Sequence, residues 1–387
     1  AERMEDKNLP TILFYAHYDV QPPDPLDLWV SAPFNPRIEG DSVFARGASD
    51  DKGQMFIHLE ALQSFIKTRG QLPVNVKVIL EGEEEIGSRH FLPFVREHTD
   101  LLACDCSIIS DTDMWAPGVP ALARSLRGLA GVEVELKGPN RDLHSGGYGG
   151  SVPNPINLLC ALVAKLHDEQ GRVTIPGFYD DVQELSEEDR RHLEELKFDE
   201  EEYRKDLGLK ALWGEDSYSA LERRWVRPTL DCNGITGGYQ GPGSKTVIPS
   251  VASVKITMRM VPFQDPDKIL AGLKSYLQSL CPPSTEITIH DRGGTPAVLL
   301  PMDGPFQDAA RSALKKHFGR QPVETRIGGS IPVAGEFTLA LKVPCIMMGF
   351  GLPDDNLHSP NEKFSLTNYH QGILTVAEFL EQVGGKR

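Results

Sequence analysis

The stretch VNVKVILEGEEEIGS (residues 74–88) joins a short apolar segment to a cluster of glutamates. Val, Ile and Leu dominate residues 74–80, as expected of a strand that is buried inside a sheet. Four glutamates follow within five residues, where their negative charges repel one another. A solvated turn would by itself account for such a cluster, so its meaning depends on what the other strand ends carry.

The composition is that of a globular protein with more than one domain. The chain has 387 residues, of which 40% are hydrophobic and 25% are charged, and this length predicts two domains. The net charge of −15, with no basic tract to offset it, argues against a nucleic-acid partner. No apolar run reaches the roughly 18 residues needed to span a bilayer, so we expect no membrane segment.

The first residues and the cysteines bear on where the protein works. AERMEDKNLP (1–10) does not resemble a secretory signal, and since the chain does not open with Met we expect that natural N-terminal residues are missing. Six cysteines in so long a chain do not predict a disulfide framework and fit a reduced, cytoplasmic protein. Cys104 and Cys106 fit two buried thiols on one face of a strand better than a zinc site.

Strands and helices alternate in the first and last parts of the chain. Helix-like residues 50–70 carry Met, Leu and Ile at helical spacing and end at Gly70. Alternation of this kind predicts parallel strands covered by helices. We expect strands at 11–17, 74–80, 106–111 and 343–350 and helices at 50–70, 91–98, 306–318 and 366–383.

The middle of the chain has a different pattern, which predicts a small α+β layer inserted into the larger α/β domain. Residues 129–138 alternate as a half-exposed strand, and the sheet that they predict has one open face. Residues 179–206 hold 13 acidic against 5 basic residues and predict a solvated helical excursion rather than an acidic binding tail. We expect further strands at 252–262 and 285–292 and helices at 154–168 and 265–280.

Unusual residues fall at the ends of the expected strands and at one helix start. His17 and Asp19 follow the first strand two residues apart, so both point to the same side. A pair of this kind can combine a metal-binding imidazole with the carboxylate that orients it. Asp50 begins the first long helix; a helix cap explains one aspartate but not the pair Asp50–Asp51.

The glutamate cluster, Asp111 and the late loop residue His358 complete this set. In an open parallel sheet, ligands bind beyond the carboxyl ends of the strands. Two divalent ions and a hydroxide between them would balance the charges of Asp50, Glu85 and Asp111. Oxygen and imidazole ligands suit zinc, manganese or cobalt, and Glu84 is then free to take a proton from water.

Eight motifs, in this order, resemble those of carnosinase-like dipeptidases: YAHYDVQP, GASDDKGQ, LEGEEEIGS, SDT, RDLHSGGYGG, GSKTVIP, GGSIPV and GLPDDNLHSPNEKF. These dipeptidases belong to the wider di-zinc family that includes aminoacylase, glutamate carboxypeptidase, acetylornithine deacetylase and succinyl-diaminopimelate desuccinylase. The resemblance implies a catalytic α/β domain, a mixed sheet flanked by helices, in two parts (1–125 and 298–387). It also implies an inserted ferredoxin-like α+β lid and dimerisation domain (126–297).

The resemblance assigns roles residue by residue. His17 and Asp111 would both bind one ion, Glu85 and His358 would both bind the other, and Asp50 would bridge the two ions. Asp19 matches the carboxylate behind His17, and Glu84 the general base that activates water and then protonates the leaving amine. His144 matches the lid histidine that reaches the partner subunit's active site, and Arg259 matches the arginine that binds the substrate carboxylate. Thr246 and Ser330 match two further positions that contact the substrate.

The predicted function is metal-dependent hydrolysis of dipeptides or similar short amides, with two divalent ions per subunit, zinc foremost and Mn²⁺ or Co²⁺ as alternatives. An N-acyl amino acid deacylase is the alternative, since it shares the chemistry and differs in its pocket. A scaffold that has lost catalysis is disfavoured, because all five ligands and Glu84 are present. The chain departs from the family in one respect: members carry several dozen residues before the first strand, and here 16 residues precede His17.

Overall fold

The computed structural model describes residues 1–385 and divides into two compact units. The first unit comprises Ala1–Ser125, Leu299–Arg326 and Ile331–Arg387. The second comprises Leu126–Val298 together with Ile327–Ser330. The second unit therefore interrupts the first along the sequence. Among residues 1–385, no helix combines the length and the apolar character of a membrane-spanning segment.

The first unit is built on an eight-stranded mixed sheet, in the order β1-β5-β2-β6-β16-β7-β14 with β15 paired to β7. Its four central strands, β5, β2, β6 and β16, are mutually parallel, whereas β1 and β7 pair antiparallel to their neighbours. This confirms the predicted mixed sheet. The strands are β1 (Glu2–Arg3), β2 (Thr11–His17), β5 (Asn75–Glu81), β6 (Cys106–Ile109), β7 (Ala121–Leu126), β14 (Val298–Leu299), β15 (Val323–Ile327) and β16 (Cys345–Met347).

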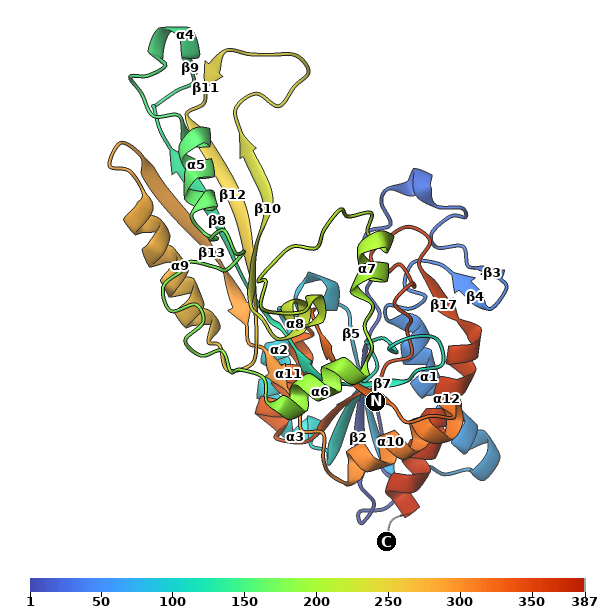
Figure 1. Ribbon diagram of the computed structural model, residues 1–387. Helices are drawn as coiled ribbons and strands as arrows, with labels where there is room; N and C mark the ends of the chain where they lie inside the picture. Colours follow the sequence, from blue (N-terminus) through green and yellow to red (C-terminus); the bar gives the residue numbers. More distant parts are fainter. Residues whose placement is uncertain (386–387) are drawn as a thin grey trace. The chain divides into compact units, whose positions relative to one another are not determined.

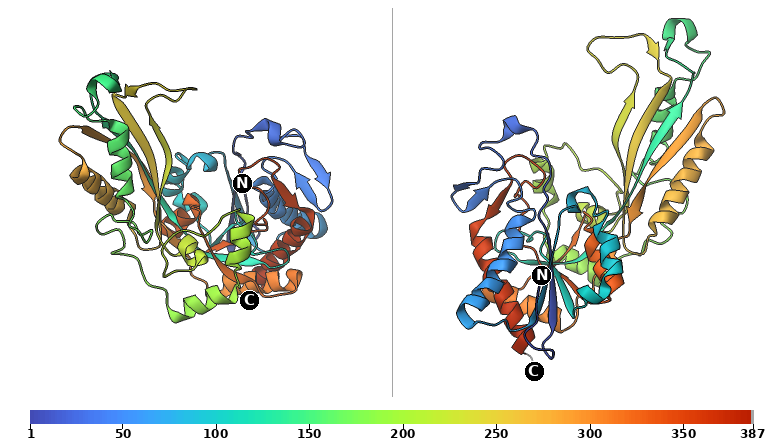
Figure 2. Two further views of the ribbon diagram at one scale, coloured as in Figure 1. Left: turned by 45° about the horizontal axis from the view of Figure 1, so that its top comes forward. Right: turned by 180° about the vertical axis from the view of Figure 1, so that it is seen from behind.

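Helices cover both faces of this sheet (Figures 1 and 2). One face carries α1 (Lys52–Arg69), α10 (Pro305–Phe318) and α12 (Leu366–Gly385). The other carries α2 (Phe91–Glu97), α3 (Thr99–Leu102) and α11 (Pro332–Glu336). Shorter elements complete the unit: single turns at Leu26–Leu28, Glu84–Ile86 and Phe337–Leu341, and a small sheet of β3 (Arg37–Glu39), β4 (Ser42–Phe44) and β17 (Lys363–Ser365).

The central strand β2 shows why the sheet is buried on both faces. Ile12 and Phe14 point into the apolar cluster shared with α1, α10 and α12. Tyr15 points the other way, against the rings of Phe91 and Phe337. Because alternate residues of a strand face opposite sides, a run that is apolar throughout can only be satisfied by helices on both. The carboxyl end of β2, at His17, is thereby fixed at the edge of the core.

The second unit is an antiparallel sheet with two helices on one face (Figure 1). The order along the chain, β8, α5, β10, β12, α9, β13, together with the sheet order β10-β12-β8-β13, is the ferredoxin-like topology that the family resemblance implied. Its main elements are β8 (Gly128–Lys137), α5 (Pro155–Ala164), β10 (Thr229–Gly237), β12 (Val251–Met260), α9 (Pro266–Leu280) and β13 (Glu286–Thr295). Smaller elements are β9 (Leu143–His144), α4 (Ser145–Tyr148), α6 (Glu187–Glu195), α7 (Glu200–Asp206), α8 (Ala220–Trp225) and β11 (Val247–Ile248).

Three departures from the sequence-based expectations concern residues discussed above or the sheet of the second unit. Strand β10 was not predicted; it is an edge strand whose residues are mostly exposed, so it lacks the apolar alternation that marks a strand. Helix α1 begins at Lys52, so Asp50 lies just before the helix and not at its first position. Strand β6 begins at Cys106, so Cys104 precedes it and the two thiols do not share a strand face.

Candidate metal centre and active site

The carboxyl ends of the central parallel strands bring most of the predicted site residues together. His17 ends β2, the turn Glu84–Ile86 follows β5, and Asp111 follows β6. These strands are direct neighbours, so their ends meet at one edge of the sheet. His358 comes from the loop that follows β16, and Asp50 comes from the segment that leads into α1.

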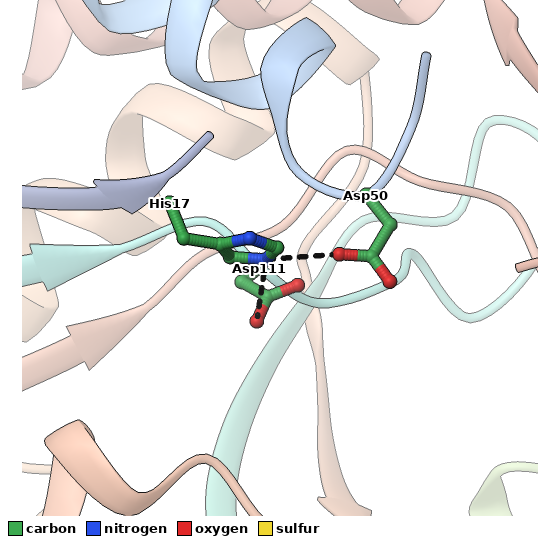
Figure 3. Close-up of side chains that lie close together, drawn as sticks. All are labelled: His17, Asp50 and Asp111. Atoms are coloured by element: carbon green, nitrogen blue, oxygen red, sulfur yellow. Dashed lines mark ion pairs between the residues drawn. The ribbon is translucent and has the colours of Figure 1, made fainter. Parts of the chain in front are cut away.

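Among residues 1–385, two groups of candidate ligands meet, His17–Asp50–Asp111 and Asp50–Glu85–His358, each with its ligand atoms within 4.8 Å of one another. Nε2 of His17 lies 2.9 Å from Oδ1 of Asp50 and 3.9 Å from Oδ2 of Asp111 (Figure 3). Nε2 of His358 lies 2.9 Å from Oδ2 of Asp50 and 3.3 Å from Oε2 of Glu85. Asp50 thus turns one carboxylate oxygen towards each histidine.

This geometry fits two divalent cations. Zinc binds nitrogen and oxygen at about 2.0–2.2 Å, so tetrahedral ligand atoms lie about 3.3–3.6 Å apart. The four histidine–carboxylate separations run from 2.9 to 3.9 Å and bracket that value, and all ligand atoms of each group lie within 4.8 Å of one another. The buried Nε2 of His17 is close to Asp50 but out of line for a hydrogen bond, and it has no hydrogen-bond partner among the described residues. A histidine nitrogen that binds a metal ion is expected to look like this: it is buried, it lies near carboxylate oxygens, and its lone pair is not used in a hydrogen bond.

The electrostatics of the site point to the same conclusion. Burial raises the pKa of Asp111 to about 7, and the charge of Asp50 adds to the effect. Burial also raises the pKa of Glu84 to about 8, with a further contribution from Asp111. Burial alone would lower the pKa of His17, yet the carboxylates around it raise it to about 11. Neighbouring carboxylates contribute to all three shifts, and cations bound at the site would oppose that contribution.

The glutamate cluster that follows β5 divides between the site and the surrounding structure. Glu81 is buried at the end of β5 and accepts a hydrogen bond from the hydroxyl of Tyr15 at 2.7 Å. Glu83 contacts the ring of His90 at the surface. Only Glu84 and Glu85 belong to the candidate site. Glu81 and Glu83 therefore have other partners, whereas Glu84 and Glu85 lie among the other acidic residues of the candidate site.

Asp19 holds the two sides of the site together. The Nδ1 atom of His17 lies 3.1 Å from the backbone oxygen of Asp19 and 3.4 Å from its Oδ1. The same carboxylate accepts hydrogen bonds from the backbone N–H groups of Glu84, at 3.3 Å, and Glu85, at 3.1 Å. Asp19 therefore lies behind His17, as expected, and also anchors the turn that carries both glutamates.

Two residues that contact the site were missed at the level of sequence. Asp51 accepts a hydrogen bond from the backbone N–H of His17 at 3.2 Å, which accounts for the second aspartate of the Asp50–Asp51 pair. Gln21 makes three contacts with Glu85: its backbone N–H donates to Oε1 at 3.1 Å, and its Nε2 donates to Oε2 at 2.8 Å and to the backbone oxygen at 3.4 Å. Gln21 lies in the quoted motif YAHYDVQP, but no spacing rule distinguishes it from a loop glutamine.

His144 and Thr246 lie together in the second unit. His144 pairs with Val247 across the short strands β9 and β11, and the backbone N–H of Ser145 donates to the oxygen of Thr246. The Nδ1 atom of His144 accepts hydrogen bonds from the N–H groups of Gly146, at 3.0 Å, and Gly147. A side chain at Gly146 would meet the imidazole, since its Cβ would lie 2.7 Å from Cε1. The exposed imidazole of His144 therefore carries its proton on Nε2.

Arg259 and Ser330 form a second pair in this unit. Nη1 of Arg259 donates to the hydroxyl of Ser330 at 3.0 Å, and that hydroxyl donates to the backbone oxygen of Arg127. Burial lowers the pKa of Arg259, which the charge of Asp231 only partly offsets. A half-buried guanidinium of this kind favours a nearby anion.

Comparison with known proteins identifies the family. A model of peptidase family M20/M25/M40 matches residues 13–382. The chain belongs to this family. Its fold is that of an M20 family metallo-carboxypeptidase from Sulfolobus solfataricus, with 36% sequence identity and a TM-score of 0.90 over 99% of this chain and 87% of the other.

The M20 chain is also similar to two curated dipeptidases. It is 33% identical to the Beta-Ala-His dipeptidase of Rattus norvegicus, covering 98% of this chain and 79% of that protein. It is 30% identical to a Cys-Gly metallodipeptidase of Schizosaccharomyces pombe, covering 98% of this chain and 81% of the relative. These matches confirm the resemblance to carnosinase-like dipeptidases and the prediction of a metal-dependent dipeptidase.

Proposed function

We propose that this M20 peptidase hydrolyses dipeptides at a centre of two divalent ions, zinc foremost. The observation that carries the proposal is the carboxylate of Asp50, whose two oxygens each face a different histidine at 2.9 Å. His17 and Asp111 would complete one ligand set, and Glu85 and His358 the other. Bound there, the ions would polarise the scissile carbonyl and lower the pKa of the attacking water towards about 7.

Glu84 is the proposed general base and acid. Burial and the charge of Asp111 raise its pKa to about 8 in the absence of cations. Positive charge at the two ligand sets would lower that pKa, because it would stabilise the carboxylate form. Glu84 would then accept the proton of the attacking water and return it to the departing nitrogen. The hydrogen bonds from the backbone of the turn to Asp19 hold Glu84 in place for both transfers.

His144 is the proposed oxyanion donor, acting on the site of a partner subunit. Its Nδ1 is occupied by two backbone N–H groups, so Nε2–H is the group that can donate. One such donor contributes about 3 kcal/mol to the stability of a tetrahedral oxyanion. The residue is exposed, which suits a group that completes another subunit's site.

The layout of the second unit supports this proposed homodimer. His144 and Thr246 lie beyond the Val251 end of β12, whereas Arg259 lies at the other end of the same strand. Eight residues at 3.3 Å each separate Val251 from Arg259 by roughly 26 Å. A dipeptide is only about 7 Å long, so one substrate cannot touch both pairs within one chain. We therefore propose that the two pairs reach one substrate from two different subunits of a homodimer.

The substrate class follows from the relatives and from Arg259. The two curated relatives are named for dipeptides, and a guanidinium that binds the free carboxylate limits the length of a substrate on that side. The structural relative from Sulfolobus solfataricus is named a carboxypeptidase, which makes longer peptides the competing possibility. Deacylation of N-acyl amino acids is the other alternative.

A substrate panel tests the proposal. Purified enzyme loaded with zinc is given dipeptides, tripeptides, pentapeptides and acetylated ornithine, and the release of amino acids is measured. Dipeptides should give the highest kcat/KM, and their C-terminal amides should be hydrolysed poorly because Arg259 would lose its partner. Faster release from pentapeptides would replace the dipeptidase with a carboxypeptidase, and faster release from acetylornithine would replace it with a deacylase.

A cytoplasmic location is proposed as well. All six cysteines are free in the structure, as expected of a protein that folds in a reducing compartment. Fractionation of the source cells, with an antibody against the chain, tests this; recovery outside the cytoplasmic fraction would contradict it.

A further inference from the structure

Glu362 has no role in the site described so far, yet its carboxylate lies directly behind one of the proposed ligands. The residue is fully buried and follows His358 by four positions. Its Oε1 accepts hydrogen bonds from the backbone N–H groups of Ser49, at 2.9 Å, and Asp50, at 3.1 Å. Its Oε2 accepts a third from the N–H of Gly47, at 2.8 Å.

These three contacts fix the backbone from which the Asp50 side chain projects. The N–H of Asp50 is held directly, and the N–H groups on either side of Ala48 are held by the same carboxylate. The hydroxyl of Ser49 is held separately, by Oδ2 of Asp355 at 3.0 Å. The backbone of this segment is therefore held at several points, which restricts the position from which the Asp50 carboxylate reaches towards His17 and His358.

The arrangement differs from an ion pair that serves folding alone. Glu362 is paired with Arg46 through a single contact of 2.8 Å between two fully buried side chains. In the second unit, Glu215 and Arg227 form a buried pair through two parallel contacts, at 3.0 and 2.8 Å. Burying a carboxylate costs free energy that a partner charge only partly returns. Glu362 directs most of its hydrogen-bonding capacity to the segment of Asp50 instead of to its partner arginine.

We propose that Glu362 is a positioning residue of the metal centre, which orients the shared ligand Asp50 through its backbone. Glu362 and His358 belong to one short segment, so the loop that supplies one ligand also aligns another. Asp50 belongs to both ligand sets, and a change at Glu362 therefore weakens the binding of both ions. The inference rests on the ligand set given under the proposed function.

The test compares Glu362→Gln with Glu215→Gln in the full-length protein. Each substitution keeps the side-chain size and neutralises a buried carboxylate that faces an arginine. Co²⁺ is titrated into metal-free protein and followed by its visible absorption, and thermal unfolding of the metal-free protein is measured alongside. Glu362→Gln places an amide NH₂ against backbone N–H groups, so we expect about ten- to a hundredfold weaker binding of both ions. Glu215→Gln should lower the unfolding temperature and leave Co²⁺ affinity unchanged.

Glu362→Asp separates position from charge. It keeps the negative charge and withdraws the carboxylate by about 1.5 Å, one carbon–carbon bond, from the N–H groups that it holds. Weakened Co²⁺ binding in this variant is expected. If Glu362→Gln does not fold, Glu362→Asp replaces it in the comparison, and failure of both to fold would assign Glu362 a structural role and overturn the inference.

Failure of the inference about Glu362 can be distinguished from failure of the proposed ligand set. Wild-type Co²⁺ affinity in Glu362→Gln, or an equal loss in Glu215→Gln, would overturn the inference while the ligand set stands. A wild-type protein that binds no Co²⁺, or a His358→Ala variant that binds both ions normally, would overturn the ligand set itself.

Discussion

Replacing Gln21 by alanine should weaken the binding of one of the two ions and leave the binding of the other unchanged. Nε2 of Gln21 donates to Oε2 of Glu85 at 2.8 Å, and Glu85 belongs only to the ligand set that includes His358. The backbone N–H of residue 21 still donates to Oε1 in the variant, so one of the two contacts to the Glu85 carboxylate is removed and one remains. The carboxylate is thereby freed to rotate away from the ion.

The size of the effect follows from that single contact. A hydrogen bond to a charged group contributes about 1.5–3 kcal/mol. Since 1.4 kcal/mol corresponds to a factor of ten in a dissociation constant, affinity for the ion at Glu85 should fall about ten- to a hundredfold. The ion at Asp111 should keep its affinity within about a factor of two, because Gln21 has no contact there.

Stepwise Co²⁺ titration of metal-free protein measures the two affinities. Gln264→Ala is the matched control, since Gln264 is a buried glutamine of the second unit whose Nε2 donates to the oxygen of Phe178 at 2.7 Å. The control should lose stability without losing either ion. Equal weakening of both ions by Gln21→Ala, or no weakening at all, would refute the assignment of Glu85 to one ion.

Three further predictions concern catalysis and acid stability. Glu84→Gln should bind two metal ions like the wild type and lose about 10²–10⁴ in kcat, by metal analysis and dipeptide assays; near-normal turnover would remove its proton-transfer role. His144→Ala should also be inactive, and mixing it with Glu84→Gln should restore part of the activity, since a mixed dimer has one intact site; no recovery would argue against action across subunits. Burial lowers the pKa of His58 to about 3, so the unfolded chain takes up the proton first as pH falls below about 6.5. The change in unfolding free energy of metal-free protein between pH 8 and pH 5, measured in urea, should therefore be less favourable by about 2 kcal/mol in the wild type than in His58→Gln, which cannot titrate.

The core of the fold could be predicted from the sequence where buried residues recur at a regular spacing or form a continuous apolar run. Strand β2 matches the expectation over Thr11–His17, because all seven residues pack between neighbouring strands and two helical layers. Strand β10 was missed because an exposed edge strand pairs through its backbone, and its side chains show no alternation. A sequence pattern reveals a strand only where its side chains are buried on one or both faces, and most side chains of β10 are exposed.

The site divides in the same way. His17, Glu85 and Asp111 were predicted because they follow parallel strands, whose ends must meet at one edge of the sheet. Gln21 and Glu362 were not, because they act on a carboxylate or on backbone N–H groups brought near by the fold. No residue type or spacing marks such contacts. The roles of residues in the second unit came from the family resemblance alone.

Crystallographic anomalous scattering at the zinc absorption edge tests the central claim most directly. We expect two peaks about 3.5–4 Å apart, with one oxygen of Asp50 on each. His17 and Asp111 should complete the surroundings of one peak, and Glu85 and His358 those of the other. A single peak, two peaks that do not share Asp50, or zinc bound elsewhere while these five side chains remain without it would contradict the account.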